Sequence, residues 1–306
     1  MLRQRTIREA VHAIGIGVHS GEKVRMTLRP AGENTGIVFA RNDVRGGSPI
    51  RACADNVSDT TLSTSLGRDG LQVATVEHLM SALWGIGIDN LIVELSAEEV
   101  PIMDGSAAPF IYLINTVGIV EQSALKQFIR IKREIEVTQG DAVAKLSPYE
   151  GFRAAYTFVA DHPVYNRYPK IAELNFSNIS YVDEVSRARS FGLVKELEHA
   201  QAINKCLGSS LENAVGIDDF AVVNEDGLRY QDEFVKHKLL DVIGDLYLLG
   251  KPILGAFDGY MSGHALNNKL ARALLRCEDA WEYATYDSVE DVEAGEPILH
   301  PAAISV

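Results

Sequence analysis

The chain has 306 residues, a length that favours two domains over one compact core. Its apolar content of 46% and charged content of 23% are those of a globular protein and exclude a disordered or collagen-like chain. A net charge of −13 argues against nucleic-acid binding, which needs a basic surface, and no apolar run reaches the ~20 residues that span a bilayer.

The N-terminal residues lack the apolar core and small-residue cleavage site of a signal peptide. Cys53, Cys206 and Cys277 are widely separated and form no C-x-x-C pair. This pattern is typical of a reducing cytosol and of a chain without disulfides. We therefore expect a soluble cytoplasmic protein without stable membrane insertion.

The first elements predicted along the chain are a turn and a strand. Residues 15–21 (GIGVHSG) are punctuated by glycine, and residues 23–29 (KVRMTLR) alternate with the period of a half-buried strand. The glycines resemble a phosphate-binding loop, but the G-K-[ST] ending is missing and no helical pattern follows. A β-hairpin is the better interpretation.

A helix is predicted over residues 75–83, where it carries His78, and a buried strand over residues 91–95 (LIVEL). Residues 101–109 form a loop before an apolar helix at 110–118. The polar run within residues 118–125 then separates two periodic segments and marks a domain junction. We expect a first domain over residues 1–125 and a second over 126–306.

The second half starts again with strands, at residues 128–132 and 153–159. Its main helix covers residues 232–245, and a glycine precedes the apolar strand 252–257. A final amphipathic helix begins near residue 263.

Each half therefore has a His-bearing helix, a glycine turn and a strand, which suggests two copies of one unit. We expect an α+β fold in which two related strand-and-helix domains pack as a sandwich, with the helices inside, the sheets outside and the active site at the domain interface.

His78, His237 and Asp241 form the candidate metal site. His237 and Asp241 are four residues apart in the predicted helix, so both project from one face. Two imidazoles and a carboxylate are the ligands of a catalytic zinc that keeps a fourth position open for water. The alternative for the helical pair is a surface hydrogen bond.

Three further residues allow two interpretations each. Glu77 adjoins His78, where a general base for water is expected, but an acid in the first turn also stabilises a helix dipole. His264 is either an electrophile or general acid, kept charged by a carboxylate such as Asp245, or a solvated helix-terminal histidine. Lys238 points about 100° away from His237 and contacts either an anionic substrate or solvent.

The loop at residues 185–192 (VSRARSFG) compresses two arginines, two hydroxyls and an aromatic before a glycine, which suits binding of an oxyanion or phosphate. The helix predicted at 193–200 and the following residues 206–210 favour an apolar groove.

These motifs together resemble the bacterial UDP-3-O-acyl-N-acetylglucosamine deacetylases, the zinc amidases that commit Gram-negative bacteria to lipid A synthesis. The resemblance runs in order through nearly the whole chain. It rests on residues 75–79 (TVEHL), 101–107 (PIMDGSA), 186–192 (SRARSFG), 224–229 (NEDGLR), 234–241 (FVKHKLLD), 243–246 (IGDL) and 262–268 (SGHALNN).

The resemblance implies that a metal-activated water cleaves the N-acetyl amide of UDP-3-O-(3-hydroxyacyl)-N-acetylglucosamine, and that an inserted segment around residues 190–216 forms a tunnel for the acyl chain. The implied cofactor is Zn²⁺, with Fe²⁺ as the alternative in the cell, and we expect a monomer. The implied metal ligands are His78, His237 and Asp241; the implied catalytic residues are Glu77 (base), His264 (charged group on the oxyanion), Asp245 (orienting His264) and Ser190 (hydroxyl on the intermediate); and the implied substrate contacts are Lys238, Phe191, Leu62, Leu197, Cys206 and Ser210.

One departure affects the nucleotide. The family commonly has an aromatic residue, on which uracil stacks, where this chain has Ala160. Two other functions remain as alternatives: a zinc amidohydrolase acting on another acylated amino sugar, and a metal-stabilised binding protein without catalysis.

Overall fold

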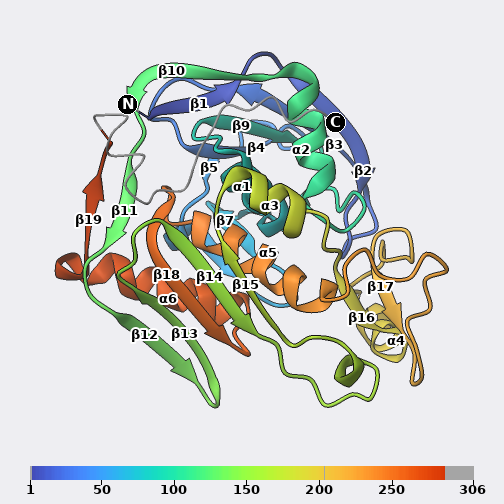
Figure 1. Ribbon diagram of the computed structural model, residues 1–306. Coiled ribbons are helices and arrows are strands. Elements are labelled where there is room, and N and C mark those ends of the chain that lie inside the picture. Colours follow the sequence, from blue (N-terminus) through green and yellow to red (C-terminus); the bar gives the residue numbers. More distant parts are fainter. Residues whose placement is uncertain (1, 203, 287–306) are drawn as a thin grey trace.

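The computed structural model describes residues 2–202 and 204–286 as a mixed α+β protein (Figure 1). The helices are α1 (Glu77–Ile86), α2 (Ala108–Val117), α3 (Asn178–Glu184), α4 (Val194–Ala202), α5 (Glu233–Tyr247) and α6 (His264–Arg276). The strands are β1 (Arg3–Ile7), β2 (Val11–Ile16), β3 (Lys23–Pro30), β4 (Ile37–Arg41), β5 (Ile50–Arg51), β6 (Val57–Asp59), β7 (Ser65–Arg68), β8 (Leu71–Val73), β9 (Leu91–Leu95), β10 (Ile119–Leu125), β11 (Phe128–Ile131), β12 (Ile135–Gln139), β13 (Ala142–Ser147), β14 (Phe152–Thr157), β15 (Ile171–Asn175), β16 (Phe191–Leu193), β17 (Val215–Ile217), β18 (Ile253–Tyr260) and β19 (Trp281–Ala284).

The first large sheet has the strand order β2-β3-β9-β4-β5. Strand β9 lies at its centre, antiparallel to β3 and parallel to β4, while β2 and β5 pair antiparallel with β3 and β4 at the edges. The hairpin expected at residues 15–29 is therefore confirmed, with β2 and β3 as its arms.

The second large sheet repeats this arrangement with the order β12-β13-β18-β14-β15. Strand β18 is antiparallel to β13 and parallel to β14, and the edge strands β12 and β15 are antiparallel to their neighbours. Strands β11 and β19 extend the sheet, with β11 parallel to the start of β18. The two central strands each follow a His-bearing helix, α1 before β9 and α5 before β18.

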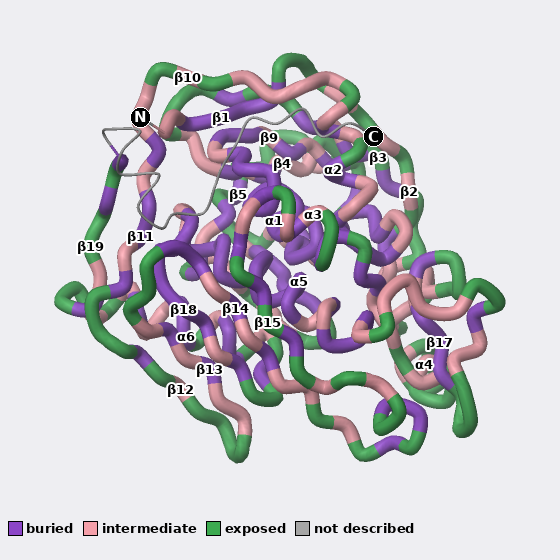
Figure 2. Tube along the Cα trace, in the orientation of Figure 1, coloured by how far each residue is buried: buried purple, intermediate pink, exposed green. Residues whose placement is uncertain are grey.

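Helices α1, α3 and α5 occupy the middle of the molecule in Figure 1, and Figure 2 shows that α5 is largely buried. Every residue of α1 is buried. Helices α1 and α5 cross closely because Gly244 of α5 has no side chain: a Cβ atom there would lie 2.0 Å from the carbonyl oxygen of Glu77 in α1. One apolar cluster joins the helices to strands of both sheets, for example Leu79 and Ile243 to Val93 and Phe257.

Most predicted elements are confirmed with small shifts of their ends. Helices α5 and α6 and strands β3, β9, β11, β14 and β18 lie where the hydrophobic pattern places them. Residues 118–125, predicted as a domain junction, contain strand β10, because β1 supplies the antiparallel partner for its backbone. The division between residues 125 and 126 stays a prediction. Within the described residues, no helix combines the length and the apolar character needed to cross a membrane.

Candidate metal centre

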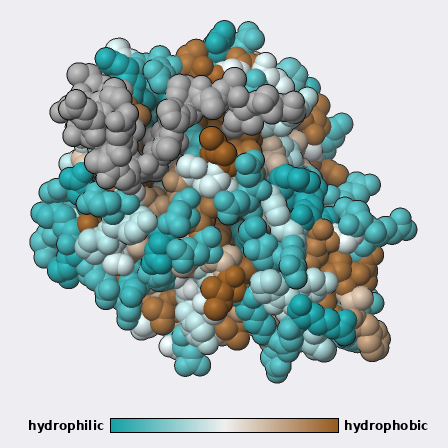
Figure 3. Space-filling view, in the orientation of Figure 1, coloured by the Kyte–Doolittle hydropathy of each residue, from teal (hydrophilic) through white to brown (hydrophobic). Residues whose placement is uncertain are grey.

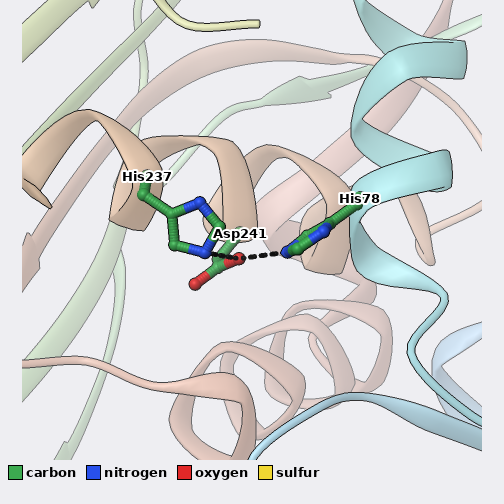
Figure 4. A group of neighbouring side chains, drawn as sticks. All are labelled: His78, His237 and Asp241. Carbon is green, nitrogen blue, oxygen red and sulfur yellow. Dashed lines mark ion pairs between the residues drawn. The ribbon is translucent and has the colours of Figure 1, made fainter. Parts of the chain in front are cut away.

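The three candidate ligands come from the two central helices. His78 lies in the first turn of α1, while His237 and Asp241 lie one turn apart on α5 (Figure 4). The helical period places the α5 pair on one face, and the close approach at Gly244 brings the start of α1 against that face. All three side chains are buried.

The side chains point their ligand atoms at one another. Oδ1 of Asp241 lies 3.5 Å from Nε2 of His78 and 3.5 Å from Nε2 of His237, and one ligand atom from each residue lies within 4.8 Å of the others. Ligand bonds of about 2.0–2.2 Å in a tetrahedral zinc site separate neighbouring ligand atoms by roughly 3.3–3.6 Å. These two separations therefore have the size that a tetrahedral ion requires.

The hydrogen bonds around the site leave the inward-facing atoms free. Nδ1 of His237 donates to the carbonyl oxygen of Ala188 at 3.0 Å, which leaves Nε2 as the lone-pair atom that faces Asp241. Lys238 donates to Oδ2 of Asp241 at 2.7 Å, whereas Oδ1 is buried and accepts no hydrogen bond from the described residues. A buried carboxylate oxygen without a donor is costly unless a cation occupies the space before it, so the residues fit a metal ion.

The protonation states of the ligands also fit a metal. Burial lowers the pKa of His237 to about 3, so its ring is neutral at physiological pH. Burial alone would raise the pKa of Asp241, but its partners, among them the Lys238 ammonium, outweigh burial and hold the pKa well below its usual value. Neutral imidazole and ionised carboxylate are the forms that coordinate metals.

Glu77 lies next to His78 and is 3% exposed. Its Oε2 accepts a hydrogen bond of 2.9 Å from the backbone N–H of Thr64, and burial raises the pKa of its carboxyl group. A carboxylate with a raised pKa accepts a proton more readily near neutral pH, which is the property of a general base.

Asp245 orients the imidazole ring of His264 through a hydrogen bond. Oδ2 of Asp245 accepts hydrogen bonds from Nδ1 of His264 at 2.9 Å and from Asn267 at 2.8 Å, and Oδ1 accepts one from Thr64 at 2.6 Å. Burial alone would lower the pKa of His264, but the Asp245 carboxylate outweighs it and raises the pKa to about 10. The imidazole therefore carries a positive charge at physiological pH.

Phe191 is the first residue of β16, and Ser190 directly precedes it. The Phe191 ring packs edge-on against the His237 ring, with their centres 5.9 Å apart. The Lys238 ammonium lies 5.6 Å from the centre of the Phe191 ring. The Ser190 hydroxyl donates to the carbonyl oxygen of Asn213 at 3.0 Å. The Ser190 backbone N–H donates to the carbonyl oxygen of Gly105 at 2.9 Å. Contact of Ser190 with a reacting group stays a prediction.

The four residues expected along the acyl chain come from three segments. Leu62 is exposed in the loop before β7, Leu197 is half-buried in α4, and Cys206 and Ser210 lie in the loop before β17. Figure 3 shows apolar atoms over the region of α4 and β17, where the exposed apolar side chains include Val194, Leu207, Leu211 and Phe220. A tunnel formed by these segments stays a prediction.

Sequence reasoning did not single out Thr64 and Asn267, although both bind the central carboxylates. Asn267 belongs to the SGHALNN motif, so a signal for it was available. Thr64 bridges Glu77 and Asp245, but it lies in the polar run TTLSTS with no period or motif, so only the folded chain identifies it.

Comparisons with known proteins cover nearly the whole chain. The family profile described as "LpxC: UDP-3-O-acyl N-acetylglycosamine deacetylase" matches residues 4–276. The chain is 55% identical over 300 residues to the UDP-3-O-acyl-N-acetylglucosamine deacetylase of Marinobacter nauticus, covering 98% of this chain and 97% of the relative. It is 56% identical to that of Chromohalobacter salexigens, covering 99% of each chain, and 52% identical to that of Thioalkalivibrio sulfidiphilus, covering 100% and 99%. The chain therefore belongs to the UDP-3-O-acyl N-acetylglycosamine deacetylase family.

Proposed function

We propose that this protein hydrolyses the N-acetyl amide of UDP-3-O-(3-hydroxyacyl)-N-acetylglucosamine to UDP-3-O-acylglucosamine and acetate, the committed step of lipid A biosynthesis. The observation that carries this proposal is the group His78, His237 and Asp241, with one carboxylate oxygen 3.5 Å from both imidazole nitrogens. Family membership supplies the substrate class.

His78, His237 and Asp241 would hold the metal, and two imidazoles with one carboxylate favour Zn²⁺, with Fe²⁺ as the alternative. When bound, the ion would act as a Lewis acid toward the amide carbonyl and lower the pKa of water at the site. The Lys238 ammonium binds Oδ2 of Asp241 and balances its charge. The other carboxylate oxygen, Oδ1, would then be the ligand atom.

Glu77 would take the proton from the attacking water. Its buried carboxylate is held by the Thr64 N–H through Oε2, and burial raises its pKa toward the range of an efficient base. Thr64 also donates its hydroxyl hydrogen to Asp245, so one residue orients both carboxylates.

His264 would stabilise the negative charge that forms on the carbonyl oxygen and donate a proton to the leaving amine. Asp245 orients the ring through Nδ1 and keeps it charged, which leaves Nε2 to face the substrate. The Ser190 hydroxyl would turn from the Asn213 carbonyl to the same oxyanion.

The substrate would lie along the loop and helix beside the metal. Lys238 and Phe191, which are already in contact, would bind the nucleotide phosphates and the sugar. Leu62, Leu197, Cys206 and Ser210 would border the acyl chain in the inserted segment around residues 190–216. Ala160 offers no ring for uracil, so we expect weaker nucleotide binding than an aromatic residue would give.

The proposed architecture is two related domains, residues 1–125 and 126–306, with helices inside and sheets outside and the metal at their interface. The identical strand orders and directions of the two large sheets support this proposal. The contribution of one ligand by α1 and two by α5 supports the position of the site. A cytoplasmic monomer remains our expectation.

Acetate release from the acylated UDP-sugar, before and after chelation, tests the function. We expect turnover to disappear on chelation and to return with Zn²⁺. An analogue without the acyl chain should react far more slowly; equal rates would favour an amidohydrolase with another acylated or simple amino-sugar substrate. Metal binding without any acetate release would instead favour a binding protein.

A further inference from the structure

Glu99 is a buried carboxylate that lies outside the metal centre, and it is 2% exposed. It precedes the loop that leads into α2 and belongs to no large sheet. Its Oε1 accepts hydrogen bonds from the His19 N–H at 2.9 Å and the Thr75 hydroxyl at 2.8 Å. Its Oε2 accepts two from Ser20, at 2.9 Å from the N–H and 2.7 Å from the hydroxyl.

The loop after β2 is built around this carboxylate. A Cβ atom on Gly17 would lie 2.3 Å from Oε2 of Glu99, so only glycine lets the loop approach so closely. None of the four donors carries a formal charge, so the loop and Thr75 together supply the solvation that a buried carboxylate needs.

Thr75 is a strained residue two positions before Glu77. Its φ is +57°, in the left-handed region that β-branched residues rarely adopt. The surrounding backbone fixes it on both sides: Ala74 pairs with the chain at Glu99 as an isolated parallel bridge, and the Val76 N–H donates to the Thr64 carbonyl at 3.1 Å. The hydroxyl contact with Glu99 holds the side chain, and α1 begins directly afterwards.

The same loop contacts the segment expected to border the acyl chain. The Leu207 N–H donates to the His19 carbonyl at 3.1 Å, and the Gly208 N–H donates to the Val18 carbonyl at 3.0 Å. Sγ of Cys206 lies 3.6 Å from Nδ1 of His19. The Glu99 carboxylate thus links Thr75, just before α1 and Glu77, to the loop after β2. That loop contacts residues 206–208 of the segment expected to border the acyl chain, here called the acyl groove.

We propose that Glu99 is a positioning residue that holds the start of α1, with Glu77 and His78, in register with the loop that supports the acyl groove. This inference rests on the proposed function. Through this link, Glu99 sets both the rate of the reaction and the preference for an acylated substrate, although it touches neither the metal ligands nor the substrate.

Glu99→Gln tests the proposal, because the amide keeps the size but replaces one acceptor oxygen by a donor. We expect kcat for the acylated UDP-sugar to fall about 10- to 100-fold, the usual effect of a small misplacement of reacting groups. The ratio of kcat/KM for the acylated substrate to that for the unacylated analogue should also fall at least about fivefold. Glu98→Gln is the matched control, since Glu98 is the exposed neighbour and should stay within about twofold of wild type.

A pair of Thr75 variants separates positioning from folding. Thr75→Val removes only the hydroxyl that binds Glu99 and should lower kcat. Thr75→Ser keeps this hydroxyl and should keep kcat near that of wild type. If Glu99→Gln does not fold, this pair of variants tests the proposal. An unchanged acyl preference in a folded Glu99→Gln protein, or equal kcat for the two Thr75 variants, would overturn the proposal. If the wild type releases no acetate, the proposed function fails, and Zn²⁺ affinity decides on Glu99: a loss of at least about tenfold in Glu99→Gln supports it and an unchanged affinity refutes it.

Discussion

Replacing Asp245 by Asn should remove the charge that keeps His264 protonated. The His264 side chain is 12% exposed, and burial alone would lower its pKa, yet Asp245 raises the pKa to about 10. Without that charge we expect the pKa to fall to about 6.5, its ordinary value, because burial then opposes the smaller effect of the Glu77 and Asp241 carboxylates, which raise it. The difference corresponds to about 5 kcal/mol of preference for the charged ring.

The sign of the effect follows from the role of the ring. His264 acts when protonated, so activity is lost as the pH rises through its pKa, and a lower pKa moves that loss to lower pH. At about pH 8 the protonated fraction would fall from nearly all to roughly 3%, and kcat/KM would fall roughly 30-fold from protonation alone.

The assay is the pH dependence of kcat/KM for acetate release, measured on metal-loaded wild type and Asp245→Asn, with NMR titration of His264 in parallel. Asp232→Asn is the matched control, because Asp232 lies at the start of the same helix and pairs with Lys236 instead. If the alkaline limbs of wild type and Asp245→Asn coincide, Asp245 does not control the charge of His264 and the reasoning fails.

Two further changes test other parts of the structure. Glu77→Gln should lower kcat by about 10²–10⁴ and leave the Zn²⁺ content unchanged in elemental analysis, because Glu77 lies outside the ligand group; turnover near that of wild type would show that another group is the base. Lys126→Met should lower the free energy of unfolding by about 3–5 kcal/mol in denaturant titration, because it leaves Asp89, 2.9 Å from the buried Lys126 ammonium, without its charge partner. Lys236→Met, at a more exposed pair, should cost less than about 1 kcal/mol, and equal losses for the two lysine variants would contradict the argument.

The sequence predicts local features well because they depend on short-range geometry. The spacing of His237 and Asp241 places both on one face of a helix whatever the rest of the chain does. The alternation at β3 and the apolar run at β9 likewise follow from the burial of one or both strand faces. Order of motifs along the chain was also sufficient to indicate the family.

The contacts that assemble the site depend on packing between distant segments. His78 contacts α5 because Gly244 lets α1 and α5 cross closely. A single glycine in a helix does not reveal from the sequence which segment packs against it. Thr64 and Asp245 are 181 residues apart, yet their hydrogen bond is among those that orient the base and the charged imidazole.

The sequence by itself therefore determined the main helices, several central strands, the candidate ligand types and the family of this protein. The tertiary structure alone decided which ligand atoms face one another, that Lys238 binds Asp241, and that Glu99 joins the loop after β2 to the start of α1. The physical reason is that periodicity and motif are properties of neighbouring residues, whereas burial, charge pairing and close backbone approach arise only when distant segments pack.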